Sequence, residues 1–224
     1  MYLAETSALM GHNLQSYRKS YEKSELLESE VSNYPLALFS SWFEEAEASG
    51  TIEEVNAVGL STLGKDGFPK TRIVLLKEYN ETGFVIYTNY SSEKGQSIAN
   101  YNKVCLSFFW PSVERQVIIK GQAEKVSEEK SKDYFNQRPR GSQIGAWASD
   151  QSAPVRDRAS LEAKKAEIEK KFQGQEIPKP PFWGGYVISP ISYEFWQGRP
   201  NRLHDRLLYT KTNPNSWSRV RLAP

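Results

Sequence analysis

The sequence has little of what many catalytic centres require. Its 224 residues include one cysteine, Cys105, and two histidines. A disulfide within the chain is therefore excluded, and no Cys/His set has metal-ligand spacing. Since no run of about 18 apolar residues occurs, no membrane span is predicted. The N-terminus lacks a basic segment followed by an apolar one, so no secretory signal is predicted and a cytoplasmic location is expected.

An excess of one charge is also missing. Lys and Arg total 29 against 27 Asp and Glu, a net charge of +2, whereas a general nucleic-acid-binding protein would be strongly basic. The chain has no P-loop, no GxGxxG after a strand and no GxSxG. His204 is followed by Asp205, but neighbouring residues on a strand point to opposite faces, so this spacing does not support a Ser-His-Asp triad.

Short strand-like runs make up much of the sequence from residue 55 onward. They are NAVGLSTL, KTRIVLLK, GFVIYTN, VCLSFFW and RQVIIKGQAEKV, followed near the end by GYVISP, SYEFWQG, DRLLYTK and SWSRVRL. The segments 64–67 (GKDG) and 80–83 (NETG) have turn composition. Short strands at regular spacing favour a barrel or a sandwich. We therefore predict a mainly β (α+β) fold, an antiparallel β-barrel with helices between its strands.

Four helices are predicted between or before these strands. The first follows Pro35, places Leu36, Phe39, Trp42 and Phe43 on one face, and ends at Gly50. The others span about 91–101, 127–137 and 153–172. The segment 138–152 is interpreted as a loop. Residues 1–32 are polar with weak periodicity, which predicts a mobile N-terminal arm with short helical pieces.

Cationic side chains interrupt the apolar runs in several places: Arg72, Lys77, Lys94, Arg138, Arg140, Arg202 and Arg206. For any one of them, surface charge is the simpler interpretation. As a set they are flanked by Gly, Ser, Thr, Gln and aromatic residues, the groups that bind a flat anionic ligand. The set is large enough for two phosphates. Strand alternation predicts that Arg72 and Lys77 lie on opposite faces.

Longer motifs resemble those of the pyridoxamine (pyridoxine) 5′-phosphate oxidase family. They are RIVLLK, RPRGSQIGAWAS, FWGGY, EFWQGRPNRLHDR and the terminal RLAP, in the family's order from about residue 33 to residue 224. The resemblance implies a split β-barrel domain over 33–224, with a C-terminal dimerisation and active-site region, and a homodimer with FMN at its interface. It also implies oxidation of pyridoxamine 5′-phosphate or pyridoxine 5′-phosphate to pyridoxal 5′-phosphate, with O2 giving H2O2.

The resemblance also implies site residues. Implied FMN contacts are Arg72, Ile73, Val74, Leu75, Leu76, Lys77, Tyr87, Thr88, Lys94, Gln116, Gln151, Ser152, Trp196 and Arg206. Implied substrate contacts are Lys77, Tyr134, Arg138, Ser142, Arg202, Leu203 and His204, with Arg18, Lys19, Ser20 and Tyr21 closing over them.

These residues are expected to have distinct roles. Arg72, Lys94 and Thr88 would bind the FMN phosphate, while Gln116, Gln151 and Ser152 would bind ring or ribityl oxygens. Trp196 and Arg206 would lie near the flavin ring. Lys77, Tyr134, Arg138 and Ser142 would bind the substrate phosphate. Arg202 and His204, two apart on a strand, would face the pyridine ring as the catalytic pair. The proton acceptor stays open between His204, solvent and a substrate amine that is already neutral.

One position departs from the family pattern, and two other functions remain open. Glu93 precedes Lys94 where the family often has a basic residue, so Glu93 either points away from the FMN phosphate or weakens its binding. A different flavin enzyme on the same barrel would have no reason to keep RLHDR or RPRGSQ. A non-catalytic flavin or pyridoxal-phosphate carrier or sensor would have nearly the same sequence, although Arg202 and His204 count against it.

Overall fold

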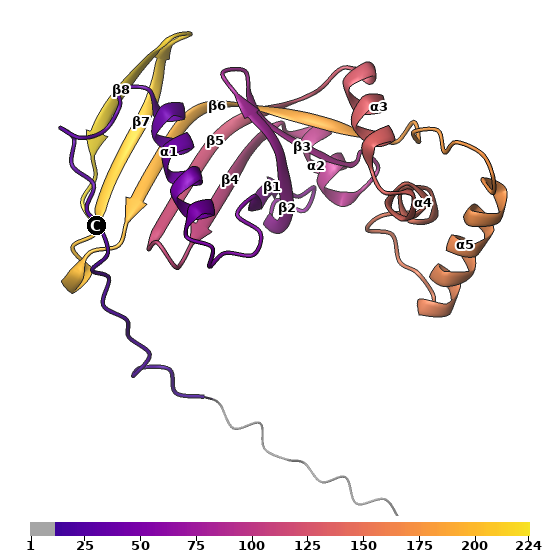
Figure 1. Cartoon of the computed structure of the whole chain (residues 1–224), viewed down its shortest axis with the longest axis horizontal. Helices are drawn as coiled ribbons and strands as arrows, with labels where there is room; N and C mark the ends of the chain where they lie inside the picture. The colour runs from indigo at the N-terminus through magenta and orange to yellow at the C-terminus, as the bar shows by residue number, and fades with distance from the viewer. Residues whose placement is uncertain (1–11) are drawn as a thin grey trace, which may run out of the picture.

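The fold is an antiparallel β-barrel, seen in a computed structural model that describes residues 12–224 (Figure 1). The sheet order is β3-β2-β1-β4-β5-β6-β7-β8, and β3 also pairs with β6, which closes the first six strands of this order into the barrel. The strands are β1 Ala57–Leu63, β2 Pro69–Asn80, β3 Gly83–Asn89, β4 Lys103–Trp110, β5 Arg115–Lys125, β6 Trp183–Gln197, β7 Asp205–Asn213 and β8 Ser216–Arg221. The predicted mainly β barrel is confirmed.

Strand β6 forms one side of the barrel and continues beyond it. The two predicted runs GYVISP and SYEFWQG form this single strand of 15 residues. A bulge opposite Lys120 and Gly121 accommodates Pro190, which has no amide hydrogen to donate to the ladder. The start of β6 pairs with β3 and its end pairs with β7. At about 3.3 Å per residue, β6 follows a path of roughly 45 Å.

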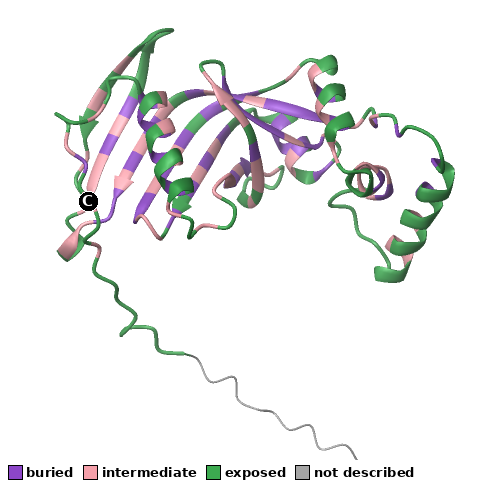
Figure 2. Cartoon of the chain, viewed as in Figure 1, coloured by how far each residue is buried: buried purple, intermediate pink, exposed green. Residues whose placement is uncertain are grey.

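Two hydrophobic cores stabilise the chain. Helix α1, Pro35–Ala48, covers the barrel with its apolar face, and its fully buried Phe39 meets Phe84 and Phe108 edge-on at ring distances of 5.0 and 5.2 Å. The smaller core lies beneath α3 Glu128–Gln137, α4 Arg140–Ala148 and α5 Arg158–Lys171. It includes Trp183 at the start of β6, so a barrel strand contributes an aromatic side chain to the core of the helices. Figure 2 shows buried positions along the barrel strands and mostly exposed positions along α5.

Three sequence predictions about helices require correction. Residues 138–152 are not all loop, because α4 occupies Arg140–Ala148 and buries Ile144 and Ala148, one turn apart. Helix α5 begins at Arg158, after Asp157 accepts a capping hydrogen bond from the Ser160 amide. Residues 12–34 form turns and extended segments without a helix, and the rest of the predicted arm, 1–11, lies outside the described residues. Across 12–224, no helix is long and apolar enough to cross a membrane.

Candidate functional site

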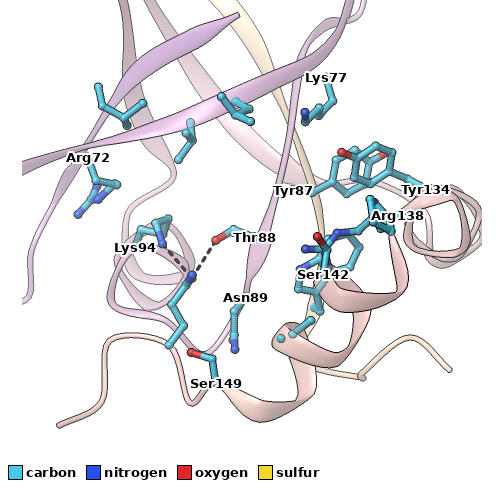
Figure 3. A pocket seen from close by; sticks show the side chains of 18 of the residues that line it. Arg72, Lys77, Tyr87, Thr88, Asn89, Lys94, Tyr134, Arg138, Ser142 and Ser149 are labelled. Carbon is cyan, nitrogen blue, oxygen red and sulfur yellow. Dashed lines mark hydrogen bonds between the residues drawn. The ribbon is translucent and has the colours of Figure 1, made fainter. Parts of the chain in front are cut away.

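A cavity of about 930 Å³ opens between strands β2 and β3 and helices α2 (Glu93–Asn100), α3 and α4 (Figure 3). Four cationic side chains line it, and none of its described lining residues is acidic. The cations are Arg72 from β2, Lys77 from β2, Lys94 from α2 and Arg138 from the α3–α4 junction. A concentration of positive charge without internal carboxylates fits a ligand that carries more than one negative charge.

Burial is the largest cause that lowers the pKa of Arg72, Lys94 and Arg138, and the positive charge of Arg72 lowers the pKa of Lys94 further. The Glu93 carboxylate, which does not line the cavity, opposes this shift for Arg72 and Lys94. The Nη1 atom of Arg138 is buried and has no hydrogen-bond partner within residues 12–224. A buried donor without an acceptor costs free energy unless a ligand satisfies it. The cavity therefore fits a bound phosphate.

A second pair of donors converges within the same cavity. The Lys94 ammonium and the Thr88 hydroxyl both donate to the Oε1 atom of Gln151, at 3.0 and 3.3 Å. Arg72 donates from Nη1 to the Leu60 carbonyl and to Thr62 Oγ1, which fixes its side chain at the cavity edge. These donors have the chemistry of an anion site, and Lys94 and Thr88 share the Gln151 amide oxygen as their acceptor.

The opposite wall of the cavity is aromatic. Tyr87 and Tyr134 stack with ring centroids 3.9 Å apart, and Trp183 lies parallel to Tyr87 at 5.5 Å. The Arg138 guanidinium lies 4.7 Å from the Trp183 ring centroid, a cation–π contact that orients it. Burial raises the pKa of Tyr87 to about 12, so its hydroxyl keeps its proton at neutral pH. Ser142 of α4 adds a further hydroxyl to this wall.

Arg72 and Lys77, which strand alternation predicts on opposite faces of β2, both line the cavity. A bulge in β2 between Leu76 and Glu78 adds one residue to that strand and shifts its alternation at Lys77. Leu76, an expected FMN contact, has its side chain in the barrel core and is only 4% exposed. Its neighbours Ile73, Val74 and Leu75 do line the cavity.

The expected catalytic pair lies elsewhere, where β6 leads into β7. The His204 ring lies 4.7 Å from that of Trp196 and 5.7 Å from that of Tyr21, the end of the predicted covering segment. His204 Nδ1 accepts a hydrogen bond from the Arg199 amide at 3.0 Å. Arg202 lies in the turn Pro200–Arg202 with φ 63°, so the expectation that it shares a strand face with His204 is wrong.

The remaining predicted residues are divided between the two regions. Arg206 forms an ion pair with Glu194 at 2.7 Å, and Gln116 lies opposite Trp196 in the sheet. Leu203 is exposed beside the turn. Ser152 lies in a smaller pocket next to the cavity, beside Gln151. Arg18, Lys19 and Ser20 are exposed, so of the covering segment Tyr21 alone packs against Trp196 and His204.

One chain therefore holds two separate groups of predicted site residues. Trp183 begins β6 at the cavity, whereas Trp196 stands next to its end, so most of the length of the strand separates the two groups. Figure 1 shows the same separation, with α2, α3 and α4 on one side of the molecule and β7 with the chain's end on the other.

Glu93, the departure from the family pattern, does not line the cavity. Its carboxylate forms an ion pair with Lys70 at 2.6 Å and borders the smaller neighbouring pocket. Sequence reasoning also missed Asn89, Gln137, Ser149 and Trp183, which line the cavity. Of these, only Trp183 had a visible signal, an aromatic residue directly before the paired glycines of FWGGY.

Comparison with known proteins gives a consistent family. Residues 44–172 match the family model described as pyridoxamine 5′-phosphate oxidase, and residues 183–224 match the pyridoxine 5′-phosphate oxidase C-terminal dimerisation region. The chain is 54% identical over 212 residues to a pyridoxine/pyridoxamine 5′-phosphate oxidase of Flavobacterium johnsoniae, which covers 95% of this chain and 99% of that relative. A relative of the same name from Rubrobacter xylanophilus is 50% identical, with 95% and 97% covered.

Solved structures agree with this assignment. PhzG from Burkholderia lata, crystallised with tetrahydrophenazine-1-carboxylic acid, superposes with a TM-score of 0.82 at 27% identity, covering 91% of this chain and all of that one. A pyridoxamine 5′-phosphate oxidase-related, FMN-binding protein of Nostoc punctiforme has a TM-score of 0.66 at 14% identity, with 87% and 100% covered, and supports the fold alone. With both family models matched and relatives that span nearly the whole sequence, this chain is an enzyme of the pyridoxamine 5′-phosphate oxidase family.

Proposed function

We propose that the protein oxidises pyridoxamine 5′-phosphate and pyridoxine 5′-phosphate to pyridoxal 5′-phosphate, with FMN as its cofactor and O2 as the electron acceptor that becomes H2O2. The observation that carries this proposal is the cavity with four cations and no described carboxylate. FMN and substrate each bring a phosphate monoester with a charge of about −1.5 to −2 at neutral pH. Together their charge is close to that of the four cations.

The two phosphates would occupy different parts of the cavity. Arg72, Lys94 and the Thr88 hydroxyl would bind the FMN phosphate, displacing the Gln151 oxygen that two of them now contact. Lys77, Tyr134, Arg138 and Ser142 would bind the substrate phosphate, and Arg138 Nη1 would gain its missing acceptor. FMN supplies the two-electron redox chemistry of the reaction when it is bound. The residues bind and orient the substrate, which accounts for most of their catalytic effect.

We propose that a second copy of the chain completes the cavity. Trp196 lies near the end of β6, and Arg202, His204 and Arg206 lie in the turn and in β7 that follow it. Most of the length of β6 therefore separates them from the cavity of their own chain. The matched dimerisation region, 183–224, includes all four. Each group also carries a large apolar side chain that is 69% exposed, Ile73 at the cavity and Leu203 at the turn. Such side chains are commonly covered at an interface between subunits.

The contacts of His204 support one role over another. Because the Arg199 amide donates to Nδ1, the neutral ring carries its proton on Nε2. Nε2 can then donate a hydrogen bond to an oxygen of the substrate ring. The one acceptor of the imidazole, Nδ1, is already bonded to the Arg199 amide. His204 would therefore orient and polarise the substrate rather than remove its proton. The proton would leave to solvent, or the substrate amine would bind already neutral.

An anaerobic titration tests the proposed function. The protein is loaded with FMN, pyridoxine 5′-phosphate is added, and the flavin absorbance is followed. We expect bleaching that air reverses, with pyridoxal 5′-phosphate formed. A yellow protein that binds the ester without bleaching would instead be a carrier or sensor. Equally fast bleaching by pyridoxine, which has no phosphate, would contradict the role given to Lys77 and Arg138.

A mixing experiment tests the shared site. Arg72→Ala and Arg202→Ala variants, each inactive alone, are allowed to exchange subunits. With random exchange, about half of the dimers are mixed and each holds one intact site, so about a quarter of wild-type activity should return. If each site is built within one chain, proven exchange restores no activity.

A further inference from the structure

Glu114 is a buried carboxylate that holds the N-terminal arm against the barrel. Its side chain is 2% exposed and lies in the turn between β4 and β5. Oε2 accepts hydrogen bonds from the backbone amides of Glu22 and Lys23 at 2.9 and 3.1 Å, and Oε1 pairs with Lys19 Nζ at 3.2 Å. The bonds from Lys23, Lys19 and Glu22 hold the pKa of Glu114 below its usual value, although burial opposes them. The carboxylate stays charged and bound to the arm.

The backbone of Glu114 holds the other side of the same contact. Its carbonyl accepts from the Gly198 amide at 2.8 Å and from Gln197 Nε2 at 3.2 Å, where the chain leaves β6 toward His204. Its φ of 59° is a left-handed conformation that a side chain with a Cβ adopts only at a cost. A glycine would fit this backbone better, so the carboxylate is present at an energetically unfavourable position. One residue thus joins the arm to the turn that carries His204.

The arm residue held in this way is Tyr21, which packs closely against Gly198. A Cβ added to Gly198 would come within 2.7 Å of Tyr21 Cγ and 2.8 Å of its Cβ. The Tyr21 ring meets Trp196 edge-on at 5.6 Å and His204 at 5.7 Å. Gly198 therefore leaves the space that Tyr21 occupies, and Glu114 holds the two residues after it.

We propose that Glu114 is a positioning residue that holds Tyr21 against Trp196 and His204, so that the arm forms a fixed wall of the substrate site. That Glu114 holds Tyr21 in place does not depend on the activity of the protein. The effect of Tyr21 on the substrate rests on the proposed function, in which His204 faces the substrate. Glu114 itself acts only through the arm.

The test uses Glu114→Gly in the full-length, FMN-loaded protein. Glycine accepts the left-handed backbone, so the variant loses the carboxylate without adding strain. We expect hydrogen exchange of the Glu22 and Lys23 amides to rise roughly tenfold or more, because each loses a charged acceptor. The His204 ring resonance should shift as Tyr21 leaves. Since the chain has only two histidines, His12→Gln assigns that resonance.

Kinetic constants test the second half of the proposal. In Glu114→Gly the KM for pyridoxine 5′-phosphate should rise several-fold while the FMN dissociation constant stays at the wild-type value. Gly198→Ala should give the same rise in KM, because it displaces Tyr21 without touching the carboxylate. Glu81→Gly, at an exposed glutamate in the turn between β2 and β3, is the matched control and should change each quantity less than twofold.

Each result decides one part of the proposal. Unchanged amide exchange and an unmoved His204 resonance in Glu114→Gly would overturn the hold on Tyr21. If the arm is released and the KM is unchanged, the arm does not form a wall of the substrate site. If wild-type protein never bleaches its flavin, the proposed function fails, while the exchange and resonance measurements still decide whether Glu114 holds Tyr21.

Discussion

Replacing Arg138 by methionine should weaken phosphate binding sharply without destabilising the FMN-free protein. The Arg138 guanidinium is desolvated, its Nη1 has no partner within residues 12–224, and burial lowers its pKa. An unsatisfied buried donor costs about 1–3 kcal/mol. The contact with the Trp183 ring returns about 0.5–2 kcal/mol. Removing both should leave the free energy of unfolding about unchanged, or raise it slightly.

The effect on ligand should be much larger. A bound phosphate would accept hydrogen bonds from the charged guanidinium, each contributing about 1.5–3 kcal/mol. Loss of two such bonds corresponds to roughly hundredfold weaker binding or more. Calorimetric titration of pyridoxal 5′-phosphate into the FMN-loaded variant measures the affinity, and urea unfolding of the FMN-free variant measures stability.

Arg140 provides the matched control two residues away. Its guanidinium donates to the carbonyls of Gln175 and Phe172 at 2.9 and 2.5 Å, so its bonds are already made within the chain. Arg140→Met should lower the free energy of unfolding by about 1–3 kcal/mol and leave phosphate affinity unchanged. The reasoning is refuted if Arg138→Met loses as much stability as Arg140→Met while it keeps its affinity.

Three further predictions concern pH and backbone packing. Burial raises the pKa of Tyr186 to about 12, so the stability contributed by its protonated hydroxyl is complete below pH 10 and lost between pH 10 and 12. In urea unfolding, Tyr186→Phe should show a smaller loss of stability over this pH range than the wild type. Hydrogen bonds from Arg221 lower the pKa of Glu28 from 4.5 to about 2, so the Glu28–Arg221 contact that holds the arm is complete above pH 4.5 and lost as pH falls toward 2. Proteolysis of the arm should therefore rise as pH falls toward 2, and Arg221→Met should show the same rise already at pH 7. A Cβ on Gly95 would come within 2.2 Å of a backbone oxygen, so Gly95→Ala should displace α2 and weaken FMN binding at least roughly tenfold, measured by fluorescence titration. Gly141 has open space around it, so Gly141→Ala should leave FMN binding at the wild-type value.

The sequence predicted the strands well because alternation and turn residues are local signals. Of the seven cations that the sequence groups together, Arg72, Lys77, Lys94 and Arg138 line the cavity and Arg140, Arg202 and Arg206 do not. Which of them meet depends on non-local features. The bulge at Lys77 arises from the pairing of β2 with β3, so the run KTRIVLLK alone does not predict it. Helix α4 was missed because Gly141 and Gly145 lower its helix propensity, while burial of Ile144 against α5 and Trp183 stabilises it. Tertiary packing overrode the local preference in both cases.

The division of the chain into two cores explains how it tolerates an unfavourable cavity. Arg72, Lys94 and Arg138 are held desolvated with no carboxylate among the described residues of the cavity, an arrangement that lowers stability. The larger core lies inside the barrel around α1 and includes none of them. The cavity lies where the barrel meets the smaller core beneath α3, α4 and α5, so the cost falls on a peripheral contact. A phosphate ligand would remove that cost.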